Sequence, residues 1–287
     1  MNRQIMVGYD GSTHADEALA WAASAARRQH APLRIVHVAR TFLDGYVVAD
    51  RPSDLTTQVG NQVLADCVGR LRAIHPDLEV TTQLEPHDSV AAALTEASRD
   101  ARLLVLGSRG RGGFAGLLLG SVSVTVAAHA HCPVVVVRTP PAAGDPTVRP
   151  VVVGVDGSPT SLSAVDYAFD QASRWGLPLV AVHAWELPSL FGTVPPWLPD
   201  EVEEIRMAEK VVLSESLAGH MERYPDVSVT SVVHRGGPAH VILAAAEDAE
   251  LLVVGSRGLG GFRGLLLGSV SQAVLHHATC PVAVVHP

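Results

Sequence analysis

Two glycine-rich segments of this sequence have the residue types and spacing of a phosphate-binding loop. Residues 107–123 read GSRGRGGFAGLLLGSVS and residues 255–271 read GSRGLGGFRGLLLGSVS, so each has the form Gly-x-x-Gly, nine residues, then Gly-Ser. Glycines let backbone N–H groups approach an anion closely, and a helix that begins after Gly-Ser adds unpaired N–H groups and the positive end of its dipole. We therefore expect each segment to hold phosphates.

The charge around these segments also favours an anion. No acidic residue occurs between Asp100 and Asp145, and none follows Glu250. The formal net charge of the chain is −8 and its pI is near 5.9, which argues against a nucleic-acid partner. The arginines of the two segments therefore lie in locally cationic stretches of an acidic protein: Arg109, Arg111, Arg257 and Arg263.

An aspartate near the start of each half is the second candidate feature. Residues 7–12 read VGYDGS and residues 153–158 read VGVDGS, which puts Asp10 and Asp156 directly after an apolar run. An Asp at the tip of a first strand can accept hydrogen bonds from a base or a ribose, or hold Mg²⁺ beside phosphates. We favour contact with the base or ribose, and the sequence leaves Mg²⁺ open.

These repeated features indicate that the chain is a tandem duplication. Each half ends with Cys-Pro and an apolar run, at residues 132–137 and 280–285, and residues 139–147 between the halves read TPPAAGDPT. A stretch so rich in Pro and Gly suits neither a helix nor a central strand. We predict a first domain over residues 1–138, a linker over 139–148 and a second domain over 149–287.

The elements that must position these residues alternate between strand and helix. In the first half we expect strands near 4–9, 33–38, 79–84, 103–106 and 134–137, and helices near 13–29, 57–74, 88–99 and 121–130. The second half repeats this pattern from residue 150, and its Ser158-Pro159 is typical of a helix start. The predicted fold class is α/β, with two tandem, doubly wound, five-stranded parallel-sheet domains of Rossmann-like type.

The chain carries few signs of export or membrane insertion. The first residues pass directly into a strand-like run, and no apolar run approaches the roughly 20 residues of a membrane span. The three cysteines, Cys67, Cys132 and Cys280, are odd in number and far apart, which favours reduced thiols over a disulfide framework. We expect a cytoplasmic protein with no membrane span.

The glycine pattern and the early Asp together resemble the ATP-binding class of universal stress proteins. The resemblance covers nearly the whole chain in the tandem, two-domain form, and it implies an adenine nucleotide alpha hydrolase-like fold that binds ATP, with or without Mg²⁺. It implies that Gly107, Gly110, Gly120 and Ser121 hold the ribose and phosphates, with Asp10 and Val38 near the adenine. The matching residues of the second half are Gly255, Gly258, Gly268, Ser269, Asp156 and Ala184.

Both halves keep every glycine and the serine of this pattern, which the resemblance associates with ATP binding. The remaining nucleotide-binding candidates flank these positions in both halves. In the first half they are Gly8, Gly11, Ser12, Ser108, Arg109, Arg111, Gly112, Gly113, Val122 and Ser123. In the second half they are Gly154, Gly157, Ser158, Ser256, Arg257, Leu259, Gly260, Gly261, Val270 and Ser271.

The resemblance implies a regulator of stress response, growth or dormancy that depends on a bound adenine nucleotide and is not an enzyme. A slow ATPase, an ATP-using enzyme and a chaperone-like dimer stabilised by nucleotide are the alternatives. It also implies that the two domains pair through the apolar final strands, 134–137 and 282–285. Association into a homodimer and an unidentified regulatory protein partner stay open.

Several motifs also have simpler interpretations. The glycine segments could be ordinary turns, and a dinucleotide site fails because the second half has Arg263 where the motif needs a small residue. Cys132 and Cys280 fit small buried side chains better than redox sensors. His129, His131, His276 and His277 lack metal-ligand spacing. His37 and His183 are equally consistent with a pocket or a structural role, and the aromatic stretches 42–46 and 185–197 could be lids or partner surfaces.

Overall fold

A computed structural model describes residues 4–40, 42–43, 46–47, 54–111, 118–138, 148–187, 197–260 and 267–287. Its contacts divide the chain into two compact units, Met1–Thr139 and Pro140–Pro287. The predicted linker lies outside the described residues except for Val148, and so do Gly112, Gly113 and Gly261. Arg263 and the proline-rich part of the stretch 185–197 also lie outside them.

The first unit alternates strands and helices around one parallel sheet. Its strands are β1 (Gln4–Gly8), β2 (Leu33–Ala39), β5 (Val80–Pro86), β6 (Ala101–Gly107) and β7 (Val134–Val137), in the spatial order β7-β6-β1-β2-β5. Its helices are α1 (Thr13–Arg28), α2 (Asp54–Ile74), α3 (Val90–Ala97) and α4 (Ser121–His129), with a single turn η1 (Ser98–Asp100) before β6. A short antiparallel pair, β3 (Phe42–Leu43) and β4 (Tyr46–Val47), occupies a stretch that the sequence left unassigned.

The second unit repeats this topology. Its strands are β8 (Val151–Gly154), β9 (Leu179–Trp185), β10 (Val229–Arg235), β11 (Leu251–Gly255) and β12 (Val282–Val285), in the order β10-β9-β8-β11-β12. Its helices are α5 (Pro159–Trp175), α6 (Pro199–Arg223), α7 (Pro238–Ala245) and α8 (Ser269–His277). The prediction of two tandem, five-stranded, parallel α/β domains is confirmed.

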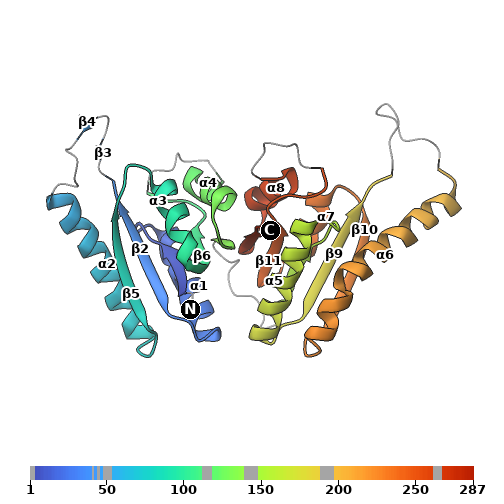
Figure 1. Ribbon diagram of the computed structural model, residues 1–287, viewed down its shortest axis with the longest axis horizontal. Coiled ribbons are helices and arrows are strands. Elements are labelled where there is room, and N and C mark those ends of the chain that lie inside the picture. The colour runs from blue at the N-terminus through green and yellow to red at the C-terminus, as the bar shows by residue number, and fades with distance from the viewer. Residues whose placement is uncertain are drawn as a thin grey trace. The chain divides into compact units, whose positions relative to one another are not determined.

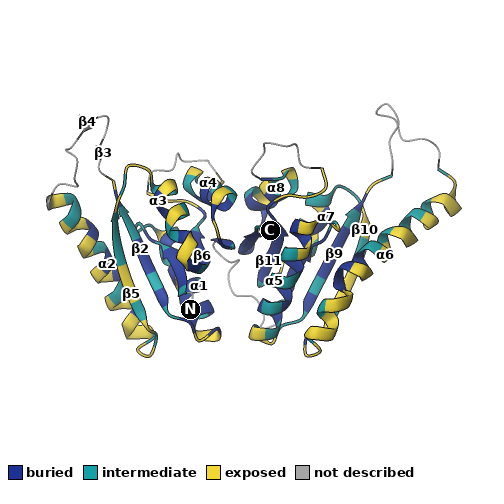
Figure 2. Ribbon diagram, in the orientation of Figure 1, coloured by how far each residue is buried: buried dark blue, intermediate teal, exposed yellow. Residues whose placement is uncertain are grey.

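Helices cover both faces of each sheet, which is why the central strands are apolar throughout. Within the first unit, α1 and α2 pack on one face and α3 and α4 lie on the other, and α5 and α6 oppose α7 and α8 in the second (Figure 1). Strands buried on both faces read as continuous runs of Val, Leu and Ile. The inner strands are accordingly mostly buried, whereas the edge strands β5 and β10 and the outer faces of α2 and α6 are intermediate or exposed (Figure 2).

The strand order creates a topological switch point in each unit. β1 lies between β2 and β6 in the first unit, and β8 lies between β9 and β11 in the second, so the chain winds in opposite directions from these pairs. In open α/β sheets, ligands bind beyond the carboxyl ends of strands at such a switch point. Gly8 and Gly107 end the two strands at this point in the first unit, and Gly154 and Gly255 do so in the second.

Several local predictions are also confirmed. Ser158 is the N-cap of α5, its hydroxyl accepts a hydrogen bond from the N–H of Ser161 (3.2 Å), and Pro159 takes the first helical position. Cys132 and Cys280 are buried. Among the described residues no helix is both long enough and apolar enough to cross a bilayer. β7 and β12 each form one edge of their own unit's sheet, and pairing through them stays a prediction.

Candidate functional site

A cavity of about 530 Å³ lies at the carboxyl ends of β8 and β11 in the second unit. One wall is the glycine segment that follows β11, which includes Arg257, Gly258, Leu259 and Gly260. The lining also includes apolar residues from strand ends and α7, which form what we call the apolar wall. Its members are Val155, Ala184, Pro238, Ile242 and Val254. The lining therefore combines backbone and cationic groups with aliphatic side chains.

The N-terminus of α8 lines this cavity. The first three helical residues, Ser269, Val270 and Ser271, all line it, and their N–H groups have no acceptor within the helix. No side chain of the described residues caps α8, whereas Ser12 caps α1 and Ser158 caps α5. The N-terminus of α4 in the first unit also lacks a side-chain cap within the described part of the chain. An anion in the cavity would satisfy these N–H groups.

Two hydrogen bonds hold α8 against the end of β11. The N–H of Gly268 donates to the carbonyl of Ser256 (2.8 Å), and the hydroxyl of Ser271 donates to the carbonyl of Gly255 (2.6 Å). The first unit repeats both bonds, from Gly120 to Ser108 (2.8 Å) and from Ser123 to Gly107 (2.8 Å). The final Ser of each glycine segment is thus a fastener between strand and helix.

Asp156 ties the two loops of the second site together. One carboxylate oxygen accepts the N–H of Ser158 (3.0 Å) and the other accepts the N–H of Leu259 (2.9 Å). Burial alone would raise the pKa of Asp156, but hydrogen bonds from Ser158, Leu259 and Ser161 outweigh it and hold the pKa below its ordinary value. The carboxylate therefore acts as a brace, meaning that it connects the β8–α5 loop to the β11–α8 loop through hydrogen bonds. The sequence analysis expected a contact with a base or ribose and did not predict this role.

Asp10 performs the same function in the first unit. Its two oxygens accept the N–H groups of Ser12 (2.9 Å) and Arg111 (2.8 Å). The side chain of Arg111 also folds back to donate to the carbonyl of Gly11 (3.4 Å). Arg109 donates from Nε to Nε2 of His14 (3.0 Å), so the imidazole accepts at this nitrogen. Both arginines of the first segment thus lie against the β1–α1 turn.

Part of the glycine pattern is explained by packing alone. A Cβ on Gly107 would lie 2.5 Å from the carbonyl oxygen of His14, and one on Gly110 would lie 2.6 Å from Oδ2 of Asp10. Gly120 and Gly268 differ, because a Cβ there would meet other atoms at 3.4 Å or more, which is ordinary contact. The final glycine of each segment is therefore not demanded by internal packing, and it stands at the helix N-terminus.

The structure brings most of the predicted residues of the second unit to the cavity. Gly157, Ser158 and Ser256 are exceptions and do not line it. The Ser158 hydroxyl is engaged as a cap and Ser256 is 1% exposed. In the first unit the hydroxyl of Ser12 caps α1 in the same way, by accepting from Ala15 (3.2 Å), and Val38 lies in β2 beside the end of the sheet.

Comparison with known proteins identifies the family. The model of the Universal stress protein family matches residues 1–138 and again 147–286. A universal stress protein of Mycolicibacterium smegmatis is 39% identical over an alignment of 293 positions that covers 99% of this chain and 97% of that protein. The chain belongs to the universal stress protein family.

Solved structures of universal stress proteins share this fold. The crystal structure of one from Archaeoglobus fulgidus covers 99% of this chain and 98% of its own, with a TM-score of 0.67 and 24% identity. A universal stress protein solved in complex with cAMP matches 48% of this chain and 97% of its own, with a TM-score of 0.33 and 29% identity. The bound cAMP belongs to the structure of that other protein.

Sequence reasoning about this universal stress protein predicted Ala184 but missed the rest of the apolar wall of the cavity. Pro238 and Ile242 lie on α7, and Val155, Ser161 and Leu267 also line the cavity without having been predicted. α7 contributes because it packs against β8 and β9 beside the strand ends. The sequence could have indicated this helix, because its first turn follows β10 directly. That the helix lies beside the cavity follows only from the order of the strands in the sheet.

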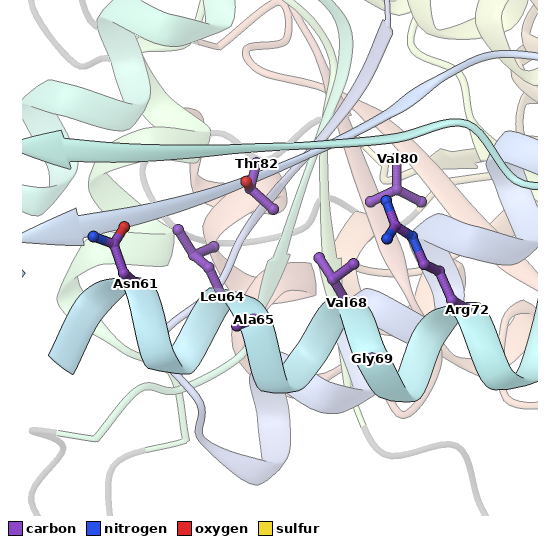
Figure 3. A pocket seen from close by; sticks show the side chains of 8 residues that line it. All are labelled: Asn61, Leu64, Ala65, Val68, Gly69, Arg72, Val80 and Thr82. Carbon is purple, nitrogen blue, oxygen red and sulfur yellow. The ribbon is translucent and has the colours of Figure 1, made fainter. Parts of the chain in front are cut away.

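A second hollow lies in the first unit, between α2 and β5 (Figure 3). It has a volume of about 390 Å³, and Asn61, Leu64, Val68 and Arg72 face Val80 and Thr82 across it. The two β5 residues belong to the amino-terminal half of the strand, so this hollow is distant from the strand ends that carry Asp10 and Gly107. We assign it no ligand.

Other candidate chemistry is weak in the described residues. No group of three or more His, Cys, Asp and Glu side chains within them could hold a metal ion. His37 and His183 are not in the cavity lining; each contacts a backbone carbonyl through Nδ1, that of Tyr9 and that of Val155, at 2.7 Å in both cases. Both histidines therefore fasten the end of the second strand of each unit to the first.

Proposed function

We propose that this universal stress protein binds an adenine nucleotide in each unit and regulates other proteins according to its occupancy, with ATP as the favoured ligand. The observation that carries the proposal is the uncapped N-terminus of α8, which opens into a cavity lined by the glycine segment. Phosphates would accept from the N–H groups of Ser269, Val270 and Ser271. Arg257, which is exposed at the same wall, would neutralise part of their charge.

The apolar part of the lining suits a flat, largely apolar base. Val155, Ala184, Pro238 and Ile242 supply aliphatic surface within the same cavity, and its volume of about 530 Å³ falls in the range of about 300–1,000 Å³ usual for small-molecule sites. A ligand with an apolar ring at one end and phosphates at the other matches both walls. The choice of adenine and of ATP rests on the family resemblance of the loops.

The donor set supports binding better than catalysis. Asp156 is the one carboxylate among the residues that line the cavity, and both of its oxygens already accept backbone N–H groups. Phosphoryl transfer needs a placed base or a water-orienting group, and usually carboxylates that hold Mg²⁺. These residues do not fit a protein-held Mg²⁺. We therefore propose neither a bound metal ion nor ATP hydrolysis as the function of this site.

The first experiment identifies the ligand directly. The protein is purified, denatured and its released small molecules are separated and analysed by mass spectrometry, and the emptied, refolded protein is titrated with ATP, ADP, AMP and cAMP by calorimetry. We expect one adenine nucleotide per unit, with ATP bound most tightly. Absence of any released nucleotide together with absence of calorimetric binding would contradict the proposal.

A matched pair of substitutions tests the site itself, and is the first specific prediction. Gly268 has N-cap geometry (φ −72°, ψ 159°), and Asp and Asn are both better N-caps than most residues, so Gly268→Asp and Gly268→Asn should fold equally well. They differ in one negative charge beside the phosphates, where two unit charges about 4 Å apart repel by about 4 kcal/mol at an effective dielectric constant of about 20. We expect ATP affinity of the second site to be at least about tenfold weaker in the Asp variant than in the Asn variant.

The same pair at Gly120 tests the first site, where the N-cap angles are φ −78° and ψ 145°. Melting temperature measured without nucleotide serves as the folding control for all four variants. Equal affinities of the Asp and Asn variants at either position would mean that no phosphate lies at that helix N-terminus. Partner capture with and without ATP then separates a nucleotide-dependent regulator from a protein that nucleotide only stabilises.

A further inference from the structure

The first arginine of the glycine segment has different surroundings in the two units. In the first unit, Nε of Arg109 donates to Nε2 of His14, the second residue of α1 (3.0 Å). In the second unit, the second residue of α5 is Thr160, which is 8% exposed. Within the part of the chain that the structure describes, Arg257 has no hydrogen-bond or ion-pair partner. The hydrogen bond that holds the arginine therefore belongs to the first unit.

The ring of His14 is oriented from its other side by a carboxylate. Its Nδ1 lies 3.2 Å from Oε2 of Glu17, one turn further along α1. A guanidinium can only donate and a carboxylate can only accept, so a neutral ring with its proton on Nδ1 satisfies both partners. The side chains of His14 and Glu17 are 21% and 20% exposed. The acceptor that meets Arg109 is therefore fixed in place by the first turns of α1.

The arginine that His14 holds lies beside the N-terminus of α4. A Cβ on Gly120, the N-cap of α4, would lie 3.5 Å from Cα of Arg109. A Cβ on Gly107 would lie 3.0 Å from Cβ of His14. The carbonyl of Gly107 also accepts from the hydroxyl of Ser123, in the first turn of α4 (2.8 Å). Arg109 and His14 therefore flank the strand end to which the uncapped helix is fastened.

The hydrogen bond to His14 leaves the other edge of the guanidinium available. Nη1 and Nη2 of Arg109 have no partner among the described residues, and the residue is exposed. These two nitrogens can donate in parallel to two oxygens of one phosphate. An arginine held at Nε has already lost part of its rotamer freedom, whereas ordering a free side chain on binding weakens affinity by about two- to tenfold. The held arginine is therefore the better prepared of the two.

The carboxylates near the start of α1 have other partners. Both oxygens of Asp10 accept backbone N–H groups. Asp16 accepts from the guanidinium of Arg70 (2.9 Å), and Glu17 faces the ring of His14. No carboxylate among the described residues pairs with Arg109. A phosphate at the N-terminus of α4 would therefore meet this guanidinium without a competing internal anion.

We propose that His14 is a positioning residue of the first site, which holds Arg109 at Nε so that Nη1 and Nη2 meet the phosphates of the ligand. The second site lacks this device, because Thr160 stands where the first unit has His14. The inference rests on the proposed function for the presence of phosphates. Its consequence is that residue 14 affects phosphate binding only through Arg109, and only in the first unit.

The hydrogen bond itself is tested first, on the full chain without ligand. NMR of the ¹⁵N-labelled protein measures the mobility and hydrogen exchange of each arginine Nε–H, and Arg109→Lys and Arg257→Lys assign the two signals. We expect the Nε–H of Arg109 to be ordered in wild type and in His14→Gln, whose amide oxygen can accept in place of Nε2. It should become mobile in His14→Thr, as that of Arg257 is in every protein. An Arg109 as mobile as Arg257 in wild type would overturn the inference.

Calorimetry with tripolyphosphate and with ATP then tests the role in binding. Every protein carries Gly268→Asp to weaken the second site, and His14→Thr and His14→Gln are each combined with Arg109 and with Arg109→Leu. We expect His14→Thr to weaken both ligands by about two- to tenfold when Arg109 is present and to have no effect with Arg109→Leu. His14→Gln should restore most of the affinity. Melting temperature without ligand is the folding control.

The two ligands separate failure of the inference from failure of the proposed function. Unchanged or stronger binding in His14→Thr, or an equal loss with and without Arg109, would overturn the inference and leave nucleotide binding intact. Tripolyphosphate binding that depends on His14, without any binding of ATP, would support the inference and contradict the adenine nucleotide as ligand. Binding of neither ligand by any of the proteins would overturn both.

Discussion

Removing the carboxylate of Asp156 should destabilise the second unit even without ligand. In Asp156→Ala, the N–H groups of Ser158 and Leu259 lose the acceptors that they now have at 3.0 and 2.9 Å. A hydrogen bond to a charged group contributes about 1.5–3 kcal/mol. The bond from Ser158 is partly buried and that from Leu259 is exposed, so the lower end of this range applies to each. We therefore expect the free energy of unfolding of the second unit to fall by about 3 kcal/mol.

Calorimetry and urea unfolding of the nucleotide-free protein measure this change. A loss of about 3 kcal/mol corresponds to a decrease in melting temperature of about 6–12 °C for a unit of this size. Asp156→Asn keeps one acceptor oxygen and should lose about half as much. Asp248→Ala is the control, since Asp248 is exposed in the same unit and does not line the cavity, and it should change stability by no more than about 0.5 kcal/mol.

The brace and a simple ligand contact give opposite results in this assay. If Asp156 bonded only to the base or ribose of a ligand, its removal would weaken ATP binding and leave the nucleotide-free protein as stable as wild type. An unchanged unfolding free energy in Asp156→Ala would therefore refute the assignment of the carboxylate as a loop brace. Asp10→Ala provides an independent repeat, because Asp10 accepts from Ser12 and Arg111 in the same way.

Two further predictions concern protons and thiols. The pKa of Asp156 in the folded protein lies below its ordinary value, so the stability that its carboxylate contributes is complete above the ordinary pKa and is lost as pH falls through the lower folded pKa. Acid unfolding followed by circular dichroism should therefore be steeper in wild type than in Asp156→Asn, and equal slopes would contradict this prediction. Burial raises the pKa of the Cys67 thiol to about 11, and the residue is 0% exposed, so iodoacetamide at about pH 8 should label Cys67 only after unfolding. Mass spectrometry measures the labelling, and fast labelling of the native protein would show that this thiol is accessible.

Much of the fold was predictable because the same sequence motifs occur in both halves of the chain. Repeated glycine segments and repeated Cys-Pro endings identify two equivalent domains, and runs such as Val151–Gly154 and Val134–Val137 identify strands buried on both faces. The Ser158-Pro159 pair fixed the start of α5. These signals depend on residues adjacent in sequence, and local backbone preference and periodicity are sufficient to interpret them.

The candidate site was predictable in its glycine segments, its aspartates and Ala184. The glycines of the segment lie at the cavity, but Gly107 and Gly110 also meet the packing demands of His14 and Asp10. The apolar wall contributed by Ile242 was missed, since a helix shows its own buried face in sequence but not which strand ends it adjoins. The two aspartates were expected to touch the ligand, and each braces two loops.

Residue types and their spacing were enough to predict the duplication, the α/β class, the order of elements and the positions where an anion could meet backbone N–H groups. The hydrogen bond from Leu259 to Asp156, the place of α7 beside the cavity and the contact between His183 and Glu209 became visible only in the folded protein. These contacts join residues that lie far apart along the chain. Strand and helix patterns arise from neighbours, whereas these contacts join residues on separate elements, which come together only when the parallel sheet aligns its carboxyl ends and the helices pack on its faces.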